Sequence, residues 1–448
     1  MAAASLDALR PCLEGVIPAT LATCSAEGVP NATYVSQMQY VDPRHVALSF
    51  QFFNKTRENL LANPQVTALV IDPVTAEAWR LDLLYLRTET EGALFQSLKA
   101  KLAGIASHSG MSGVFRLQGV DIHRVLAVER VPGRGRGRPA PRRNLLNALR
   151  TTSARLAECS DLASLSDQLL ALLASEFEVT HALLLMADEA RERLYTVASR
   201  GYAATGVGSE IAYGDGVIGV AAQHRTPIRI SHFTMDYGYG RAAREGAQAH
   251  DLPLEEAIPF PGLPEPHSQL AVPVLASGRL LGVLCVESPQ DLRFSYDDED
   301  ALVTLAAQVG LLVRALQCDA ETGPEAEDGA ALAPPDAAGP PIEVRHFRVD
   351  DSVFLGADYL IKGVPGAILW KLLRTCQETG RCHFSNRELR LAAAELRLPE
   401  ITDNLETRLL LLQRRLAERS PHIAIEKTGR GLFRLVVSHP VRLVDVET

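Results

Sequence analysis

Two stretches of this chain cannot build a hydrophobic core, and they divide the sequence into three parts. Residues 131–143 consist of Gly, Pro and Arg apart from one Val and one Ala. Residues 319–341 hold six carboxylates and no basic residue. Both compositions are typical of exposed or disordered connectors, because they offer too little apolar surface to offset the entropy of folding. We therefore expect folded parts at residues 1–130, 144–318 and 343–448, joined by linkers at residues 131–143 and 319–342.

The bulk composition indicates a soluble, cytoplasmic protein. The chain has 448 residues, of which 47% are hydrophobic and 22% charged, and it has no apolar run of the roughly 18 residues that a membrane helix needs. Its seven cysteines are scattered and odd in number, which predicts no disulfide framework. The net charge is −9, but residues 343–448 carry 17 Lys and Arg against 14 Asp and Glu. This slightly basic third part permits contact with nucleic acid.

The first part contains a strand pattern that turns directly into a helix pattern. Residues 46–64 read VALSFQFFNKTRENLLANP, where β-branched and aromatic residues give way to a polar, cationic turn and a short helix. Free backbone N–H groups and the positive end of the helix dipole meet at such a turn, and Lys55 and Arg57 add full charges. This combination predicts binding of an anionic phosphate.

Residues 10–130 resemble the flavin-binding split barrel of the pyridoxamine-phosphate-oxidase-like family. The resemblance rests on the strands and turns of PATLATCSAEGVPNATYVSQMQYVDPRHVALSF and on NKTRENLLANP. It implies a homodimer with FMN, or a related flavin, at the dimer interface. The cofactor contacts that it implies are Val35, Ser36, Gln37, Gln39, Ser49, Phe50, Asn54, Lys55, Thr56 and Arg57. A barrel that has lost its cofactor is the alternative.

The second part alternates between helix and strand patterns. Two apolar helical patterns span residues 145–177, and LAVPVLASGRLLGVLCVES predicts a hairpin around Ser277 and Gly278. Together with GDGVIGVAAQHRTPIRI and RFSYDDEDALVTLAAQVG, these patterns make residues 144–317 resemble a GAF domain, an α/β sandwich that senses small molecules.

The GAF resemblance implies a ligand pocket over the sheet, closed by the segment before the hairpin. Candidate ligand contacts in that segment are Tyr237, Tyr239, Arg241 and His267. Its histidines share no helical face, so we expect no metal site. The alternative is a GAF domain that binds no ligand and only dimerises through its terminal helices.

The third part places a small sheet before three helical patterns and a final hairpin. Residues 366–380 predict a helix that stops at Gly380, and Ser385 and Glu388 predict a capping box for the next helix. Residues 401–418 predict a third helix with a leucine stripe. The four consecutive leucines from Leu409 to Leu412 also place one leucine on the outer face of this helix. Such a helix could instead pack against a partner protein.

This order of elements resembles the winged helix-turn-helix domain of response regulators, most closely over LLLLQRRLAERSPHIAIEKTGRGLFRL. The resemblance implies DNA binding, with the third helix in the major groove and the wing on the backbone. The DNA contacts that it implies are Thr402, Asn404, Thr407, Arg408, Arg414 and Arg430.

These patterns predict a multidomain α+β chain with a split β-barrel, a GAF α/β sandwich and a C-terminal winged helix-turn-helix. The hypothesis that follows is a ligand- or redox-responsive transcriptional regulator with a flavin-type cofactor, a small effector and DNA as its partners. The competing hypothesis is an FMN-dependent oxidoreductase regulated by its other domains. No P-loop, nucleophile elbow, HExxH motif or paired catalytic carboxylates are evident, so we predict no catalytic residue. A cofactor-free assembly platform is the third alternative.

Overall fold

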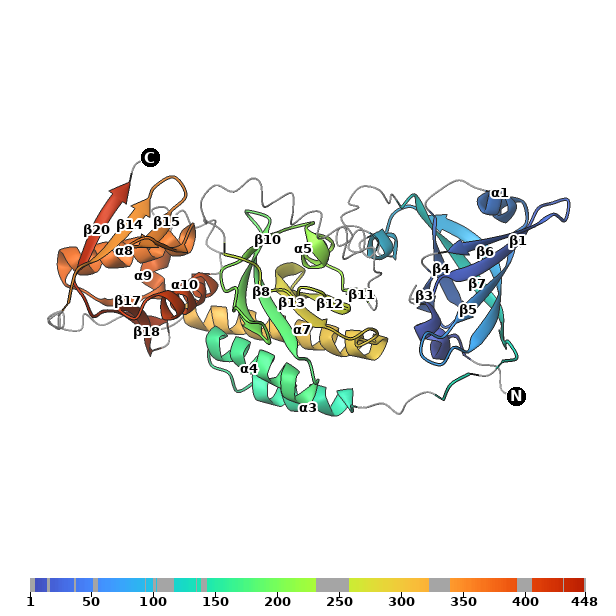
Figure 1. Ribbon diagram of the computed structural model, residues 1–448, viewed down its shortest axis with the longest axis horizontal. Helices are drawn as coiled ribbons and strands as arrows, with labels where there is room; N and C mark the ends of the chain where they lie inside the picture. The colour runs from blue at the N-terminus through green and yellow to red at the C-terminus, as the bar shows by residue number, and fades with distance from the viewer. Residues whose placement is uncertain are drawn as a thin grey trace.

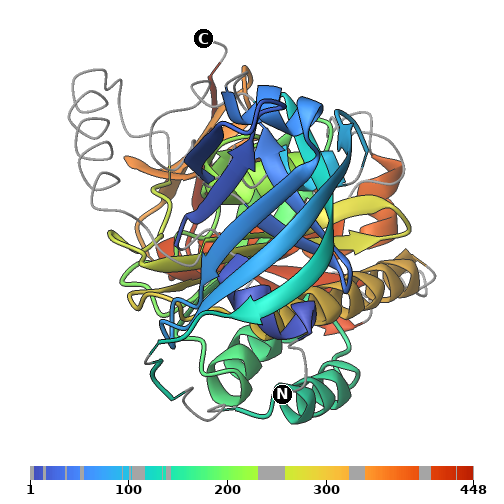
Figure 2. The same ribbon diagram turned by 90° about the vertical axis from the view of Figure 1, so that its right-hand side faces the viewer.

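The computed structural model arranges the chain as three bodies in a row (Figure 1). A β-barrel lies at one end, a sheet flanked by helices lies in the middle, and a domain containing α8, α9 and α10 lies at the other end (Figure 1). Figure 2 looks along this row with the barrel nearest the viewer. The structure describes residues 5–13, 17–35, 38–50, 55–92, 94–99, 102, 117–133, 135–137, 143–230, 258–321, 339–392, 405–429 and 431–446.

The barrel is one antiparallel sheet of seven strands in the order β2-β1-β5-β6-β7-β4-β3. Alternate strand residues point inward and form a core with the 3₁₀ helix η1. The short helix α1 follows β4 and packs on β1 and β2. The elements are η1 (Leu6–Leu13), β1 (Ala19–Cys24), β2 (Pro30–Val35), β3 (Met38–Asp42), β4 (His45–Phe50), α1 (Lys55–Ala62), β5 (Gln65–Ile71), β6 (Ala78–Glu89) and β7 (Gly119–Arg130).

The middle domain is a six-stranded antiparallel sheet with helices on both faces. Its strand order is β10-β9-β8-β13-β12-β11. Apolar residues of α3, α4 and α7 fill the core on one face, and α5 covers the other. The predicted hairpin is confirmed, since β12 and β13 turn at Ser277 and Gly278. The elements are α3 (Leu145–Leu156), α4 (Leu162–Glu176), β8 (His181–Asp188), β9 (Arg193–Arg200), β10 (Glu210–Ala212), α5 (Gly216–His224), β11 (Ile228–Ile230), β12 (Ser268–Ala276), β13 (Arg279–Ser288) and α7 (Tyr296–Glu321).

Helix α7 touches all three bodies. Over Tyr296–Cys318 it is long and apolar enough to cross a bilayer by composition, so the expectation that the chain has no such run is wrong. Its inner face nevertheless belongs to the core of the middle domain, as in a core helix. At its start, Arg10 of η1 lies 3.5 Å from Asp300 and 4.4 Å above the Tyr296 ring. At its end, Leu316 faces the C-terminal domain. The helix continues to Glu321, past the predicted start of the acidic linker at residue 319.

The C-terminal domain has a four-stranded sheet, β16-β15-β14-β20, and a three-stranded sheet, β17-β19-β18. The predicted stop is confirmed, since Gly380 ends α8 with φ +73°. Half of the predicted capping box is present: Ser385 Oγ accepts a hydrogen bond from the N–H of Glu388 at 3.2 Å, whereas the Glu388 carboxylate pairs with Arg381. The predicted hairpin is present as β18 and β19. The elements are β14 (Ile342–Phe347), β15 (Ser352–Leu355), β16 (Asp358–Ile361), α8 (Val364–Thr379), β17 (His383–Ser385), α9 (Asn386–Leu391), α10 (Leu405–Arg419), β18 (Ile423–Gly429), β19 (Leu432–Val437) and β20 (Val441–Val446).

One pair of cysteines departs from the sequence-based expectation. Cys376 and Cys382 form a disulfide, with their Cα atoms 5.1 Å apart. The scattered cysteines predicted no disulfide framework, and this single local bridge was not foreseen. The reason is local: Gly380 ends α8 in the left-handed conformation and turns the chain back, which brings the two residues together.

Candidate functional site

The start of α1 presents part of the donor set that a phosphate group needs. Lys55 is exposed at the first position of the helix. Thr56 Oγ1 accepts a hydrogen bond from Asn31 Nδ2 on β2 at 2.9 Å, which leaves its own hydroxyl proton to donate elsewhere. The first-turn N–H groups of a helix have no intrahelical acceptor, so they add further donors. Asn54, also predicted here, lies outside the described residues.

Arg57 points into the barrel. Its Nη1 lies 2.5 Å from Asp121 Oδ1 on β7, and its Nη2 donates to Thr88 Oγ1 on β6 at 2.8 Å. The guanidinium also lies 4.6 Å from the ring centre of Phe50. The Arg57 and Asp121 side chains are only 12% and 8% exposed. In this arrangement the charge of Arg57 is neutralised inside the barrel, so Lys55 is the cation of this turn that faces solvent.

A buried histidine lies beside this ion pair. His123 Nδ1 is 3.0 Å from the backbone carbonyl oxygen of Asp121, and its ring meets the edge of Tyr85. The pKa of His123 is lowered, mainly by burial; the carbonyl and the charge of Asp121 oppose this shift, and the nearby Arg57 cation adds to it. The imidazole is therefore favoured in its neutral form within the barrel.

The residues predicted to contact a flavin ring divide between two faces of the barrel wall. Val35 packs on the inner core, and Phe50 contacts the inward-facing Arg57. Gln39 pairs with Ala47 on the other face. The Ala47 side chain belongs to a separate hydrophobic cluster that also contains Phe95 and Leu98 of the helical residues 94–99. Ser49 is two residues from Ala47, so strand alternation places it on that same face. Ser36 and Gln37 lie outside the described residues.

In the middle domain, a buried carboxylate lies on the sheet face opposite the terminal helices. Glu287 of β13 is 3% exposed. Its Oε2 accepts hydrogen bonds from Tyr202 Oη and the N–H of Leu263, both at 2.9 Å, and its Oε1 accepts one from Gln269 Nε2 at 2.9 Å. Burial, together with the Glu287 charge, raises the pKa of Tyr202 well above its usual range, so the phenol remains a proton donor.

The side chain of Gln269 gives this cluster an unused acceptor. Its Oε1 is buried and has no hydrogen-bond partner among the residues that the structure describes. The cluster therefore joins a carboxylate to an amide oxygen, a set that suits ligand N–H groups. The sequence carried a signal that we did not use, namely a glutamate inside the apolar strand LLGVLCVES.

The ligand contacts predicted for the middle domain fall elsewhere. His267 is exposed, and its Nδ1 lies 3.3 Å from Asp291 Oδ1, so its ring is at the rim and outside the Glu287 cluster. Tyr237, Tyr239 and Arg241 lie outside the described residues.

The C-terminal domain docks on the middle domain through α10. Arg408 Nη2 donates to Asp188 Oδ2 at the end of β8, at 2.7 Å, and the two side chains are 5% and 1% exposed. The Arg408 guanidinium also lies 5.2 Å from the Tyr195 ring on β9. Tyr195 belongs to the hydrophobic core of the C-terminal domain, so the two domains share a packed interface.

More polar bonds surround this buried pair. Arg414 donates to the Val197 carbonyl oxygen at 2.6 Å and lies 2.7 Å from Asp167 Oδ1. Lys427 of β18 lies 2.7 Å from Asp161, the N-cap of α4. The predicted DNA contacts of α10 are thus turned toward the middle domain, and Thr407 is buried as well. Thr402, Asn404 and Arg430 lie outside the described residues.

Comparisons with known families identify two of the three parts. Residues 161–313 match the GAF domain, and residues 5–128 match the pyridoxamine 5'-phosphate oxidase family. The chain therefore joins a pyridoxamine-phosphate-oxidase-like barrel to a GAF domain in a multidomain α+β arrangement. Among curated proteins, nothing matches the chain.

Several solved structures are similar to parts of the chain. The GAF domain of a phosphoenolpyruvate-protein phosphotransferase from Acinetobacter is 22% identical, with 39% of this chain and 95% of that chain covered and a TM-score of 0.30. Free methionine-R-sulfoxide reductase from Neisseria meningitidis is 20% identical, with 39% and 90% covered and a TM-score of 0.30. An FMN-binding protein from Syntrophomonas wolfei is 17% identical, with 29% and 86% covered and a TM-score of 0.25.

Proposed function

We propose that this protein is a ligand-responsive signalling regulator in which the GAF domain controls the C-terminal domain. The observation that carries the proposal is the docking of α10 through the buried pair of Arg408 and Asp188. Asp188 ends β8, and β8 pairs with β13, which carries Glu287. The effector cluster and the docking contact therefore belong to one sheet, but at opposite ends of β8, because Glu287 pairs with His181 and Asp188 is the last residue of the strand. A ligand that shifts β8 along its length acts on α10 through Asp188.

The effector that we propose is a small molecule with N–H donors. The Glu287 carboxylate and the Gln269 amide oxygen supply acceptors for such groups, and Tyr202 holds the carboxylate in place. The Glu287 carboxylate is already bonded, so the selectivity rests on Gln269 Oε1: a ligand that buries this acceptor without donating to it leaves it unpaired, which is costly.

The output that we propose is DNA binding by the C-terminal domain as a winged helix. Arg408 and Arg414 reach a duplex only after α10 leaves the GAF domain, so the docked arrangement is the silent one. Thr402, Asn404, Thr407 and Arg430 complete the proposed contact surface. A ligand with different affinities for the docked and released arrangements shifts their populations by that difference.

We also propose that the barrel holds FMN, or a related flavin, in a cytoplasmic homodimer. The donor chemistry of Lys55, Thr56 and the first turn of α1 supports a phosphate at this position. When bound, the flavin supplies redox chemistry as a further input. Arg57 is held by Asp121 and Thr88 within the barrel, so Lys55, exposed at the start of α1, is the cation that attracts the phosphate from solvent.

The test of the output uses the full chain and a random DNA library at low salt. We expect the Asp188→Asn variant to enrich a defined sequence, and the wild-type protein to retain much less DNA. Adding Arg408→Ala to Asp188→Asn removes the enrichment if Arg408 contacts DNA. If the Asp188→Asn variant enriches no DNA sequence above background, DNA binding is refuted.

The test of the cofactor is the absorbance spectrum of the purified chain, with mass spectrometry of whatever co-purifies. Yellow protein that loses flavin in Lys55→Ala supports the proposal. Colourless protein that ignores added FMN refutes it. Oxidation of a reduced nicotinamide by the flavin-loaded protein would instead favour the oxidoreductase hypothesis.

A further inference from the structure

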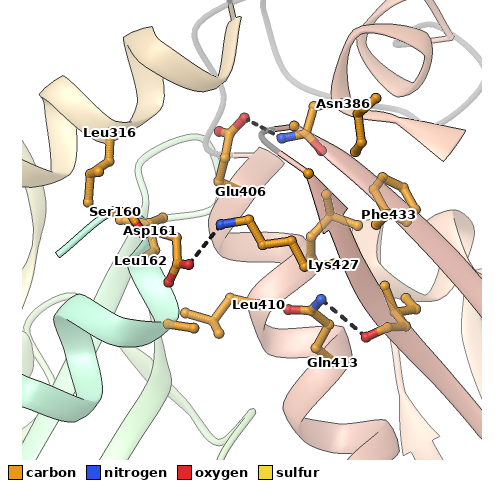
Figure 3. Close-up of a pocket in the computed structure, with 16 residues that line it drawn as sticks. Ser160, Asp161, Leu162, Leu316, Asn386, Glu406, Leu410, Gln413, Lys427 and Phe433 are labelled. Carbon is orange, nitrogen blue, oxygen red and sulfur yellow. Dashed lines mark hydrogen bonds and ion pairs between the residues drawn. The ribbon is translucent and has the colours of Figure 1, made fainter. Parts of the chain in front are cut away.

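A cavity of about 320 Å³ lies between the GAF domain and the C-terminal domain. The start of α4 and the end of α7 form one wall, and α10, β18 and β19 form the other (Figure 3). This volume is at the lower end of the range of small-molecule sites, which often lie between domains. The cavity lies on the sheet face covered by the terminal helices, whereas the Glu287 cluster lies on the face of α5. It is therefore a separate site.

The lining of this cavity is mainly apolar. Leu162 and Leu316 contribute from the GAF side, and Leu410, Ile425 and Phe433 contribute from the C-terminal side. An apolar molecule that fills such a space gains from removal of its surface from water, about 25 cal/mol per Å². The Phe433 ring also offers a face or an edge to an aromatic ligand.

The charged groups of the lining are already paired. Lys427 lies 2.7 Å from Asp161 across the domain boundary (Figure 3). Glu406 accepts hydrogen bonds from Asn386 at 3.1 Å and from Arg390 at 3.1 Å. A charged ligand would have to break one of these pairs, or remain unpaired itself, and either outcome is costly in a partly buried site. The lining therefore favours an uncharged ligand.

We propose that this cavity binds a compact, uncharged, mainly apolar molecule, and that its occupant holds the two domains together. A ligand that contacts both walls binds the docked arrangement and not the released one. By linkage it stabilises docking as its concentration exceeds its dissociation constant. This inference goes beyond the proposed function, because it depends neither on DNA nor on flavin.

The test measures binding of three probes that share one ring: benzyl alcohol, benzoate and benzylamine. Ligand-detected NMR with the full chain gives each dissociation constant. We expect saturable binding of benzyl alcohol and about tenfold weaker binding of the two charged probes, or about 1.4 kcal/mol. Equal binding of all three probes, or no saturable binding of benzyl alcohol, overturns the proposal.

Substitutions that fill the cavity locate the binding. Ala163→Trp on the GAF wall and Leu432→Trp on the C-terminal wall should each weaken benzyl alcohol binding about tenfold or more. Ala154→Trp, at an exposed position of α3, is the matched control and should leave binding unchanged. Circular dichroism checks that each variant folds, and two walls are used so that failure of one variant does not decide the outcome. Wild-type affinity in either folded cavity variant overturns the assignment.

The reciprocal experiment tests the effect on docking. If the occupant joins the two domains, then Asp188→Asn, which weakens docking at a residue that is not part of the cavity lining, should weaken benzyl alcohol binding as well. Unchanged affinity in that variant would refute the joining role. These readouts contain no nucleic acid, so a failure of DNA binding leaves them intact.

Discussion

Removal of the Asp188 charge should release α10 from the GAF domain. Asp188→Asn keeps the shape of the side chain and the acceptor that bonds the N–H of Arg191. It removes the carboxylate charge that lies 2.7 Å from the buried Arg408 guanidinium, at a contact where the two side chains are 5% and 1% exposed. Removing one member of a buried ion pair costs about 3–5 kcal/mol. Applied to docking, this is a decrease of about 150-fold to about 5,000-fold in the docking equilibrium constant.

Hydrogen exchange measures this release directly. Peptides from α10 and β9 should lose protection in Asp188→Asn, while peptides from β13 in the GAF core keep theirs. Asp167→Asn is the matched control, because Asp167 pairs with Arg414 at the same interface but is 70% exposed. An exposed pair contributes about 0–1 kcal/mol, so this control should change protection little.

A double variant separates loss of the pair from general damage. Replacing both partners, with Asp188→Asn and Arg408→Met, also removes the buried cation that had lost the Asp188 charge and should restore much of the protection. Two results refute the reasoning: unchanged exchange of α10 in Asp188→Asn, or equal effects of Asp188→Asn and Asp167→Asn.

Three further predictions concern the barrel and the C-terminal domain. Lys55→Ala should weaken binding of added FMN at least about tenfold, measured by flavin fluorescence, without lowering the unfolding temperature; equal affinity in the variant counts against a phosphate at α1. The folded-state pKa of His123 lies below its ordinary value of 6.5, so the unfolded barrel binds the proton first and stability should fall as the pH falls below about 6.5. Denaturant titrations at several pH values give the free energy of unfolding as a function of pH. This free energy should fall less steeply with decreasing pH in His123→Gln than in the wild-type protein, and an identical pH dependence would contradict the assignment. Gly380→Ala should cost about 1 kcal/mol of C-terminal domain stability, because this position has φ +73°; a denaturation midpoint that does not move would argue against the cap.

The elements that local chemistry determines could be predicted from the sequence. The stop of α8 at Gly380 and the hairpin turn at Ser277 each depend on residues within a few positions of one another. Positive φ angles and capping side chains act over that same range, so a reading of neighbouring residues is sufficient.

The partners of charged side chains could not be predicted in the same way. Helical periodicity separated Arg408 from the leucine stripe of α10, but the anion that pairs with it is Asp188, in another domain. Likewise, the turn at Arg57 has the composition of a phosphate site, yet its guanidinium bonds Asp121 across the barrel. Both partners depend on how strands and domains meet, which no local pattern records. The alternative of a leucine-rich helix packed on a protein partner is closest to the arrangement of α10, with the GAF domain as that partner.

The length of α7 has a consequence for how the chain could evolve or be engineered. Its 26 residues make a rod of about 39 Å, with Tyr296 against the barrel at one end and Leu316 against the C-terminal domain at the other. Each residue inserted into such a rod turns everything beyond it by about 100°. The rotation of one end of α7 relative to the other therefore determines which side chains face each neighbour. Insertions that add close to a whole number of helical turns are the ones that the molecule should tolerate.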